Sequence, residues 1–418
     1  MFIGNKTFII TAMFFCTISS RSAFGYDYNA TRFEGDVSYA HAFQQNTFDS
    51  FIPPEGDSDD IENVSRKFQT VLHLKKSREF SVIFDGQYVE RPYGESEGRI
   101  NQFNATISLD EKFKLRVGRQ RTLWGKGFAY VPTDFINPPL DPSATDVAKI
   151  GVPAVSVDYI SPSYALTLLA TEEEKEGDSF GLKWTSSVIT GADLDLIYYS
   201  APSIDRSFGI SGSVDAEQVL WSGLSGFVFN AGISHYKKSR YPKLGPNLNS
   251  LGDVFFVPSD ETPEEGYVSY SVGLTYQGSG GWVLIGERYH IDDAYTQKEF
   301  SSIRNSLSNL INYNASSEQN WYDILTFGRI QQDYLSLSLG TENITEGDSK
   351  LTDTLGVEFL VLSNLGDNSY VTSVNLISTY WSSVELMLRI QAPFGGKESE
   401  FGIIPFKWHT QFQIKYGF

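Results

Sequence analysis

Apolar and polar side chains alternate with a period of two along much of this chain. In the clearest segment, VSYSVGLTY at 268–276, apolar Val, Tyr, Val, Leu and Tyr alternate with small or hydroxyl-bearing residues. Similar alternation runs through 80–85, 193–198 and 384–391. A period of two places successive side chains on opposite faces of a β-strand. The pattern therefore predicts an all-β chain whose strands each have one apolar and one polar face.

The connections between the predicted strands alternate between short turns and long polar loops. Short turns are expected at 75–79, 110–112, 161–163, 190–192 and 277–281, and long loops at 45–65, 125–150, 237–265 and 293–320. A short helix is expected inside the last loop, at 299–310. Short turns at one end and long loops at the other are typical of outer-membrane barrels. A soluble propeller would instead show a sequence repeat, which we do not find.

Together these features predict a transmembrane antiparallel up-and-down β-barrel of about 18 strands, with about 16 as the alternative. The count depends most on 215–235 and 321–340, where the alternation is weakest. The mean hydropathy of -0.23 resembles that of a water-soluble protein. In a barrel, however, lipid-facing and lumen-facing residues alternate and cancel in any averaging window. No segment beyond residue 25 is apolar enough to predict a membrane-spanning helix.

The chain ends in TQFQIKYGF, which reads as a strand that stops on an aromatic residue. Phe412, Ile414, Tyr416 and Phe418 share one face, and the other face is polar or glycine. We expect this strand to close the barrel against the first strand, because backbone groups in lipid must all be paired. A terminal phenylalanine after alternating aromatics also resembles the signal that outer-membrane barrels present to their assembly machinery. These four residues are therefore the predicted assembly signal.

The first 25 residues resemble a cleaved secretory signal. Lys6 precedes an apolar core at 8–18, and Ala23 and Gly25 place small residues at the expected cleavage site before residue 26. The core is too short for a spanning helix, which needs about 20 apolar residues. The only cysteine, Cys16, follows a large residue, which argues against lipidation. A mature barrel at 26–418 would contain no cysteine, which excludes disulfides and thiolate sites.

The formal net charge of -18 argues against nucleic acid as a partner, because nucleic-acid binding needs a basic face. Much of the acid lies in predicted loops, such as 55–62 and 172–174. The first run is not an EF-hand, since Ile61 and Glu62 occupy positions that need an oxygen ligand and a glycine. Solvated loops explain both runs, and weak binding of divalent cations is the alternative.

The most distinctive stretch is LRVGRQRTLWGKGFAYVPTDFINPPLDP at 115–142. Its GRQ (118–120), WG (124–125) and DFINP (134–138) elements resemble the signatures of alginate-export-type outer-membrane channels. PFGGKESEFG at 393–402 resembles the same group. The resemblance implies a porin-like barrel. Alginate-export channels have strongly basic lumens, whereas this chain is acidic, and this difference argues against an anionic polysaccharide as the solute.

Arg119 and Arg121 have the same parity as apolar Phe113, Leu115 and Val117, which predicts that they face lipid. A charge at mid-membrane would be unfavourable by about 2–4 kcal/mol. Two arrangements avoid this cost. In the first, a β-bulge near Gly118 turns the two arginines inward, where they extend the basic row of Lys114 and Arg116. In the second, they lie at the headgroup level.

The proline-rich loop that follows these arginines is long and apolar, so we expect it to fold into the barrel mouth and constrict it. Its candidate constriction residues are Trp124, Tyr130, Asp134 and Asn137. Charged residues on the polar faces of predicted strands, with the two arginines, are candidates for lining a pore: Asp85, Lys114, Arg116, Arg119, Arg121, Asp158, Lys183, Asp193, Asp195, Glu287, Glu358, Glu385 and Arg389. Ordinary wetting of a polar interior is the alternative role.

Nothing in the sequence predicts catalysis, a metal or a cofactor. None of the five histidines forms a metal-spaced pair, and no Gly-x-Ser-x-Gly elbow occurs. We therefore expect a non-enzymatic channel in the bacterial outer membrane, for diffusion or export of small or linear hydrophilic solutes. Its expected partners are membrane lipids, the barrel-assembly machinery and the solute or polysaccharide. The alternatives are a non-conducting barrel that serves surface polysaccharide and a barrel hydrolase.

Overall fold

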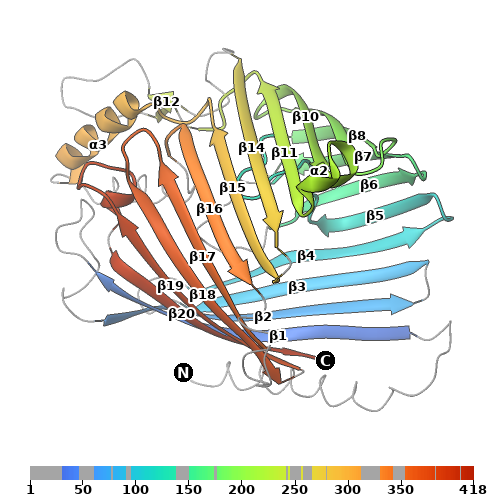
Figure 1. Cartoon of the computed structure of the whole chain (residues 1–418), viewed down its shortest axis with the longest axis horizontal. Helices are drawn as coiled ribbons and strands as arrows, with labels where there is room; N and C mark the ends of the chain where they lie inside the picture. The colour runs from blue at the N-terminus through green and yellow to red at the C-terminus, as the bar shows by residue number, and fades with distance from the viewer. Residues whose placement is uncertain are drawn as a thin grey trace.

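The computed structural model shows a closed antiparallel β-barrel (Figure 1). In the part of the chain that it describes, 18 strands form one sheet, and each is hydrogen-bonded to a neighbour on both sides. Consecutive strands pair in sequence order, and the first strand also pairs with the last. The predicted all-β barrel with about 18 strands is confirmed.

The structure describes residues 31–46, 61–76, 79–90, 96–137, 150–173, 177–241, 243–244, 256–257, 266–278, 280–311, 330–341, 354–381, 383–404 and 406–418. The predicted signal at 1–25 and residues 55–60 of the first acidic run lie outside these ranges.

The first nine strands are β1 (Thr31–Asn46), β2 (Ile61–Lys76), β3 (Phe80–Glu90), β4 (Glu97–Ser108), β5 (Phe113–Gln120), β6 (Val152–Ile160), β7 (Tyr164–Glu173), β8 (Gly177–Ser186) and β9 (Ala192–Ala201). The other nine are β10 (Asp205–Asp215), β11 (Phe227–Tyr236), β14 (Tyr267–Gln277), β15 (Trp282–His290), β16 (Asp333–Thr341), β17 (Leu355–Asn364), β18 (Tyr370–Trp381), β19 (Val384–Phe394) and β20 (Phe406–Gly417). β12 (Lys243–Leu244) and β13 (Phe256–Val257) form a separate pair.

The alternating sequence pattern sorts side chains between the outer and inner faces of the barrel. On β10, Phe208 and Ile210 are exposed on the outside, whereas Ser207 and Ser211 are buried inside. Exposed Ile233 lies directly opposite Ile210 on β11, so the apolar row continues around the barrel. An apolar exterior of this kind is stable only in hydrocarbon, which makes the barrel a membrane-spanning one.

The longest connections lie at one end of the barrel, and most connections at the other end are short turns. The exceptions include the short connections after β9 and β17 at the long-loop end and the longer ones after β10 and β16 at the other end. The predicted short turns at 110–112 and 161–163 fall between β4 and β5 and between β6 and β7. The long connection between β15 and β16 contains α3 (Gln297–Ile311), which matches the predicted helix. In the uncertain region 215–235, the short α2 (Ala216–Val219) and the 3-10 turn η1 (Ser222–Leu224) join β10 to β11. Among the described residues, no helix has the length and apolarity needed to span a membrane.

The last strand closes the barrel as the sequence predicted. β20 pairs with β1 and β19 and carries Phe412, Ile414 and Tyr416 on its exposed outer face. Phe418 extends this pairing, since its backbone exchanges two hydrogen bonds of 2.9 and 3.1 Å with Gly35. The chain end is therefore held in the barrel wall.

Candidate pore constriction

The connection that follows β5 turns into the barrel and lies along its inner wall. Three inward-facing glycines mark its course: Gly181 on β8, Gly209 on β10 and Gly232 on β11. A methyl group on Gly181 or Gly209 would collide with Trp124 or Thr133 of the connection, and one on Gly232 would press against Pro132. Residues 121–137, hereafter the inward loop, thus rest on strands that leave room for them.

Aromatic packing holds one side of the inward loop against the wall. The Trp124 ring meets Tyr199 of β9 edge-on, with ring centroids 6.3 Å apart. Phe135 stacks on the same tyrosine at 6.3 Å and meets Tyr236 of β11 at 6.4 Å. All four side chains in these contacts are buried and belong to one cluster with Leu169 of β7. Hydrophobic burial therefore drives the loop inward.

A buried carboxylate on β15 fixes the middle of the inward loop. Glu287 faces inward, is 1% exposed and accepts hydrogen bonds from three consecutive backbone N–H groups. The donors are Phe128, Ala129 and Tyr130, at 2.6, 3.1 and 2.7 Å. Three donors of this kind compensate a carboxylate for the loss of water. The loop therefore spans the wall from β8 to β15.

Local hydrogen bonds bring the two ends of the inward loop together. The Asn137 side-chain amide donates to the Thr122 carbonyl at 2.5 Å and to the Asp134 carboxylate at 2.8 Å. The Thr133 hydroxyl donates to the Trp124 carbonyl at 2.9 Å. The WG element and residues 134–137 thus make one compact turn.

Neighbouring loops brace the inward loop from the long-loop end. Arg240, which follows β11, donates to the Tyr130 hydroxyl at 3.0 Å and to buried Asp293 at 3.3 Å. Asp293 belongs to the long connection that contains α3 and also accepts a hydrogen bond from the Tyr236 hydroxyl at 2.5 Å. Three connections are therefore tied together inside the mouth.

A second buried carboxylate joins the last loops. Glu400, between β19 and β20, accepts from the Ile330 N–H at 2.9 Å, the Tyr334 hydroxyl at 2.6 Å and the Asn364 side chain at 2.5 Å. Burial raises the pKa of Glu400 to about 7, and nearby Asp367 adds to the rise, while these hydrogen bonds oppose it. Glu400 therefore holds its loop in a packed position whose stability depends on pH.

Most of the predicted charged candidates on β3 to β9 lie on the inner face and form ion pairs. Arg121 pairs with Asp85. The other pairs are Arg116 with Asp158 at 3.9 Å, Lys183 with Asp195 at 4.0 Å, and Asp193 with Lys126 of the inward loop at 3.5 Å. Lys114 shares the inward parity of Arg116 on β5 and lies opposite Asp158 in the pairing.

The candidates on β17 and β19 form a separate inner network. Glu358 accepts from Ser338 at 3.2 Å and from Asn375 at 2.8 Å, and Arg389 donates to Asn375 at 2.9 Å. Glu385 lies opposite Lys415 of β20 in the pairing. These hydrogen bonds run between strands of the wall, from β16 to β19.

Arg119 and Arg121, which share one face in the sequence pattern, have different surroundings in the structure. The pairing of β5 with β4 and β6 runs through Gly118 without a register shift, so no bulge there turns either of them inward. Arg121 points inward because β5 ends at Gln120 and the chain then leaves the sheet. Arg119 stays opposite Phe103 in the outward-facing row and donates to the Gly151 carbonyl at 2.8 Å. Its inclusion among the pore-lining candidates is corrected accordingly.

The four predicted constriction residues turn towards the wall or towards each other. Trp124, Tyr130, Asp134 and Asn137 are all buried. The exposed large side chains of the inward loop are instead Leu123 and Phe128, at 67% and 44%. No sequence pattern marks these two residues, nor Lys126, Arg240, Glu400 and the three inward glycines. Only a contact between distant segments reveals their roles.

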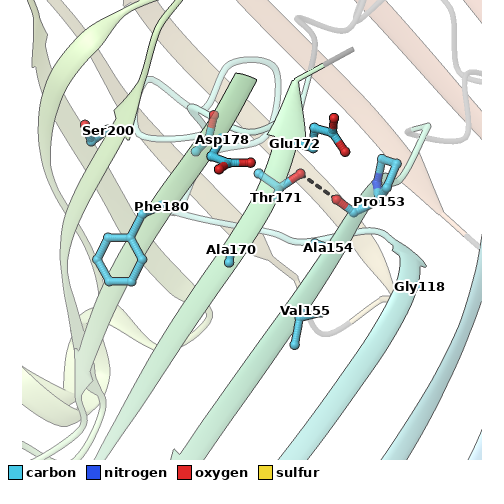
Figure 2. Close-up of a pocket in the computed structure, with 11 residues that line it drawn as sticks. Gly118, Pro153, Ala154, Val155, Ala170, Thr171, Glu172, Asp178, Phe180 and Ser200 are labelled. Carbon is cyan, nitrogen blue, oxygen red and sulfur yellow. Dashed lines mark hydrogen bonds between the residues drawn. The ribbon is translucent and has the colours of Figure 1, made fainter. Parts of the chain in front are cut away.

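A groove of about 650 Å³ lies on the outer surface of the barrel wall, at the long-loop end of β6 to β8. Figure 2 shows Val155, Ala170 and Phe180 on the strands beside it and Glu172 and Asp178 near its upper edge. These side chains have the outward parity of their strands, so the groove faces away from the inward loop. Within the described residues, no group of three or more His, Cys, Asp and Glu could hold a metal ion.

Comparison with known proteins finds no matching family model and no matching curated protein. Solved structures do match along nearly the whole chain. OccAB1 from Acinetobacter baumannii matches with a TM-score of 0.56 at 7% identity, covering 96% of this chain and 98% of that one. OccK5 (OpdH) from Pseudomonas aeruginosa matches at 0.53 and 9%, covering 92% and 97%. The outer membrane protein OprD from Pseudomonas aeruginosa matches at 0.51 and 9%, covering 94% and 96%. At these identities, the likeness shows that the chain shares the barrel fold of these proteins.

Proposed function

We propose that this chain is a channel of the bacterial outer membrane through which small hydrophilic solutes diffuse. The observation that carries the proposal is the inward loop, which Glu287 holds inside a barrel with a polar inner face. A loop fixed inside a membrane barrel narrows the passage without breaking the wall. The shared fold with the outer membrane protein OprD supports the same location.

The alternative solute is a linear polysaccharide in export, as the resemblance of 115–142 to alginate-export-type channels implies. A long polymer needs an open path through the whole barrel. The inward loop and the loops tied together by Arg240 and Glu400 occupy part of that path. The packing therefore favours small solutes over a polymer.

We assign partners to two parts of the barrel, its apolar exterior and its last strand. The apolar outer rows contact membrane lipid. Phe412, Ile414, Tyr416 and Phe418 form the outward edge of the closing strand, and we assign to them recognition by the barrel-assembly machinery. No catalytic role is part of the proposal.

Planar-bilayer recording of the purified mature protein tests this proposal. We expect stepwise single-channel currents from the wild type. A variant with 126–134 replaced by a short Gly-Ser linker should give larger steps, because it removes the part of the loop that lies along the inner wall between β9 and β15. Glu90→Gln, a change in an ion pair on the outward-facing row of β3, serves as the control and should leave the steps unchanged.

Folded protein that never conducts would contradict the channel. Equal conductance of the wild type and the linker variant would contradict the constriction. Passage of a linear polysaccharide through the wild type would favour the export function.

A further inference from the structure

The cations beside the inward loop are balanced by carboxylates on the same wall. Lys183 lies 4.0 Å from Asp195, and Lys126 lies 3.5 Å from Asp193. The pairs of Arg116 and Arg121 described above continue the pattern towards β3. A row of paired charges attracts neither anions nor cations strongly, because each field is offset by a neighbour of opposite sign.

The Lys126–Asp193 pair presents both of its charges to water and has the most exposed carboxylate of the four pairs. The side chains of Lys126 and Asp193 are 31% and 41% exposed, whereas Asp195 and Asp85 are buried beneath their cations. Asp193 is fixed on β9 and accepts a hydrogen bond of 2.5 Å from the Ser187 hydroxyl. A solute inside the barrel can therefore reach a positive and a negative group side by side.

The inward loop that carries Lys126 also has two exposed apolar side chains, three residues before it and two residues after it. Leu123 and Phe128 are the exposed members of a loop whose other large apolar side chains are mostly buried. The Leu123 carbonyl accepts a hydrogen bond from Lys183 at 3.3 Å, which places the backbone of Leu123 beside the Lys183–Asp195 pair. Asp195 lies two residues from Asp193 on the same face of β9. Inside a wall lined mainly with polar side chains, these two residues offer apolar contact area.

We propose that the constriction selects small zwitterions that carry an apolar side chain, such as apolar α-amino acids. Lys126 contacts the solute carboxylate, Asp193 contacts its ammonium group, and Leu123 and Phe128 contact its side chain. A zwitterion can replace both partners of the ion pair at once, so neither charge is left without a partner. A net anion or cation can satisfy only one of them. This inference rests on the proposed channel function and names its solute class.

The first test is the reversal potential of the wild type in a tenfold KCl gradient. We expect a permeability ratio of K⁺ to Cl⁻ within about twofold of unity, since the charges are paired. Asp193→Asn should shift the ratio towards Cl⁻ and Lys126→Met towards K⁺. Opposite shifts from the two partners would not follow from a merely structural role.

The second test is block of single-channel current by matched solutes. Leucine carries both charges and an apolar side chain. 4-Methylpentanoate lacks its ammonium group, 3-methylbutylamine lacks its carboxylate, and glycine lacks its side chain. We expect leucine to block at a concentration at least severalfold lower than the other three. The double variant Lys126→Met/Asp193→Asn should lose this preference while keeping its ion selectivity, and Glu90→Gln should keep both.

Strong selectivity of the wild type for K⁺ or Cl⁻, or equal block by the four solutes, would overturn the inference. Both results come from the wild type, so the inference can fail even if a variant does not fold. A complete absence of current would instead overturn the proposed channel function.

Discussion

Replacing Glu287 with glutamine tests whether one carboxylate holds the inward loop in place. One carboxylate oxygen accepts from Ala129 and Tyr130, and the other accepts from Phe128 at 2.6 Å. The glutamine carbonyl can keep the first two bonds. Its NH₂ group would then meet the Phe128 N–H, so a donor would face a donor.

The expected free-energy change follows from these contacts. The lost charge-assisted bond and the unpaired buried donor each destabilise the seated loop by about 1–3 kcal/mol. Relief from burying a charge offsets part of this loss. A net change of about 2–4 kcal/mol shifts the ratio of displaced to seated loop by about 30- to 1,000-fold.

Two measurements follow this shift. Amide protection factors at 128–130 should fall in Glu287→Gln, and single-channel recordings should show frequent visits to a larger conductance. Glu358→Gln is the matched control, because Glu358 also faces inward and accepts two hydrogen bonds, but only from the strands β16 and β18. If protection and conductance of Glu287→Gln equal those of the wild type, the carboxylate does not hold the loop.

Three further changes have defined outcomes. Gly181→Ala places a methyl group against the Trp124 ring. The midpoint of thermal unfolding should therefore fall by an amount equivalent to about 1–3 kcal/mol. An unchanged midpoint would show that the inward loop does not rest on Gly181. The raised pKa of Glu400, about 7 against an ordinary 4.5, means that its loop is most stable below pH 4.5 and weakens as the pH rises to about 7. Amide protection of that loop should follow this trend, and Glu400→Gln should abolish it. Deleting Phe418 removes a ring that lies 5.9 Å from Phe33, which should weaken barrel closure by about 1 kcal/mol and reduce the folded fraction in outer membranes.

The barrel could be predicted because each strand carries its own signal. Segment 268–276 alternates strictly, and the first seven of the eleven residues of β14 alternate between buried and exposed. Turn and loop lengths gave independent support. Both signals are local, and neither needs a contact between distant segments.

Near strand ends, the parity of a residue predicted less well whether its side chain faces inward or outward. Arg119 and Arg121 share parity, yet only Arg121 reaches the interior, because the strand stops between them. A register shift does occur nearby, between β3 and β4 beside Asp85, where Asn101 adds an inward side chain that donates to the Asp85 carboxylate at 3.1 Å. Periodicity cannot place such a shift without the partner strand.

The residues of the inward loop that face the passage could not be identified from the largest side chains in its sequence. A loop that lies against a wall inside a barrel has one face on the wall and one face in the passage. Trp124 and Tyr130 stood out as large aromatic residues, and for that reason they are the side chains that gain most from burial against the wall. The face left for a solute then consists of what the wall does not cover, namely Leu123, Lys126 and Phe128. Solute selectivity should therefore respond to changes at these three residues, and loop position to changes at the two aromatics.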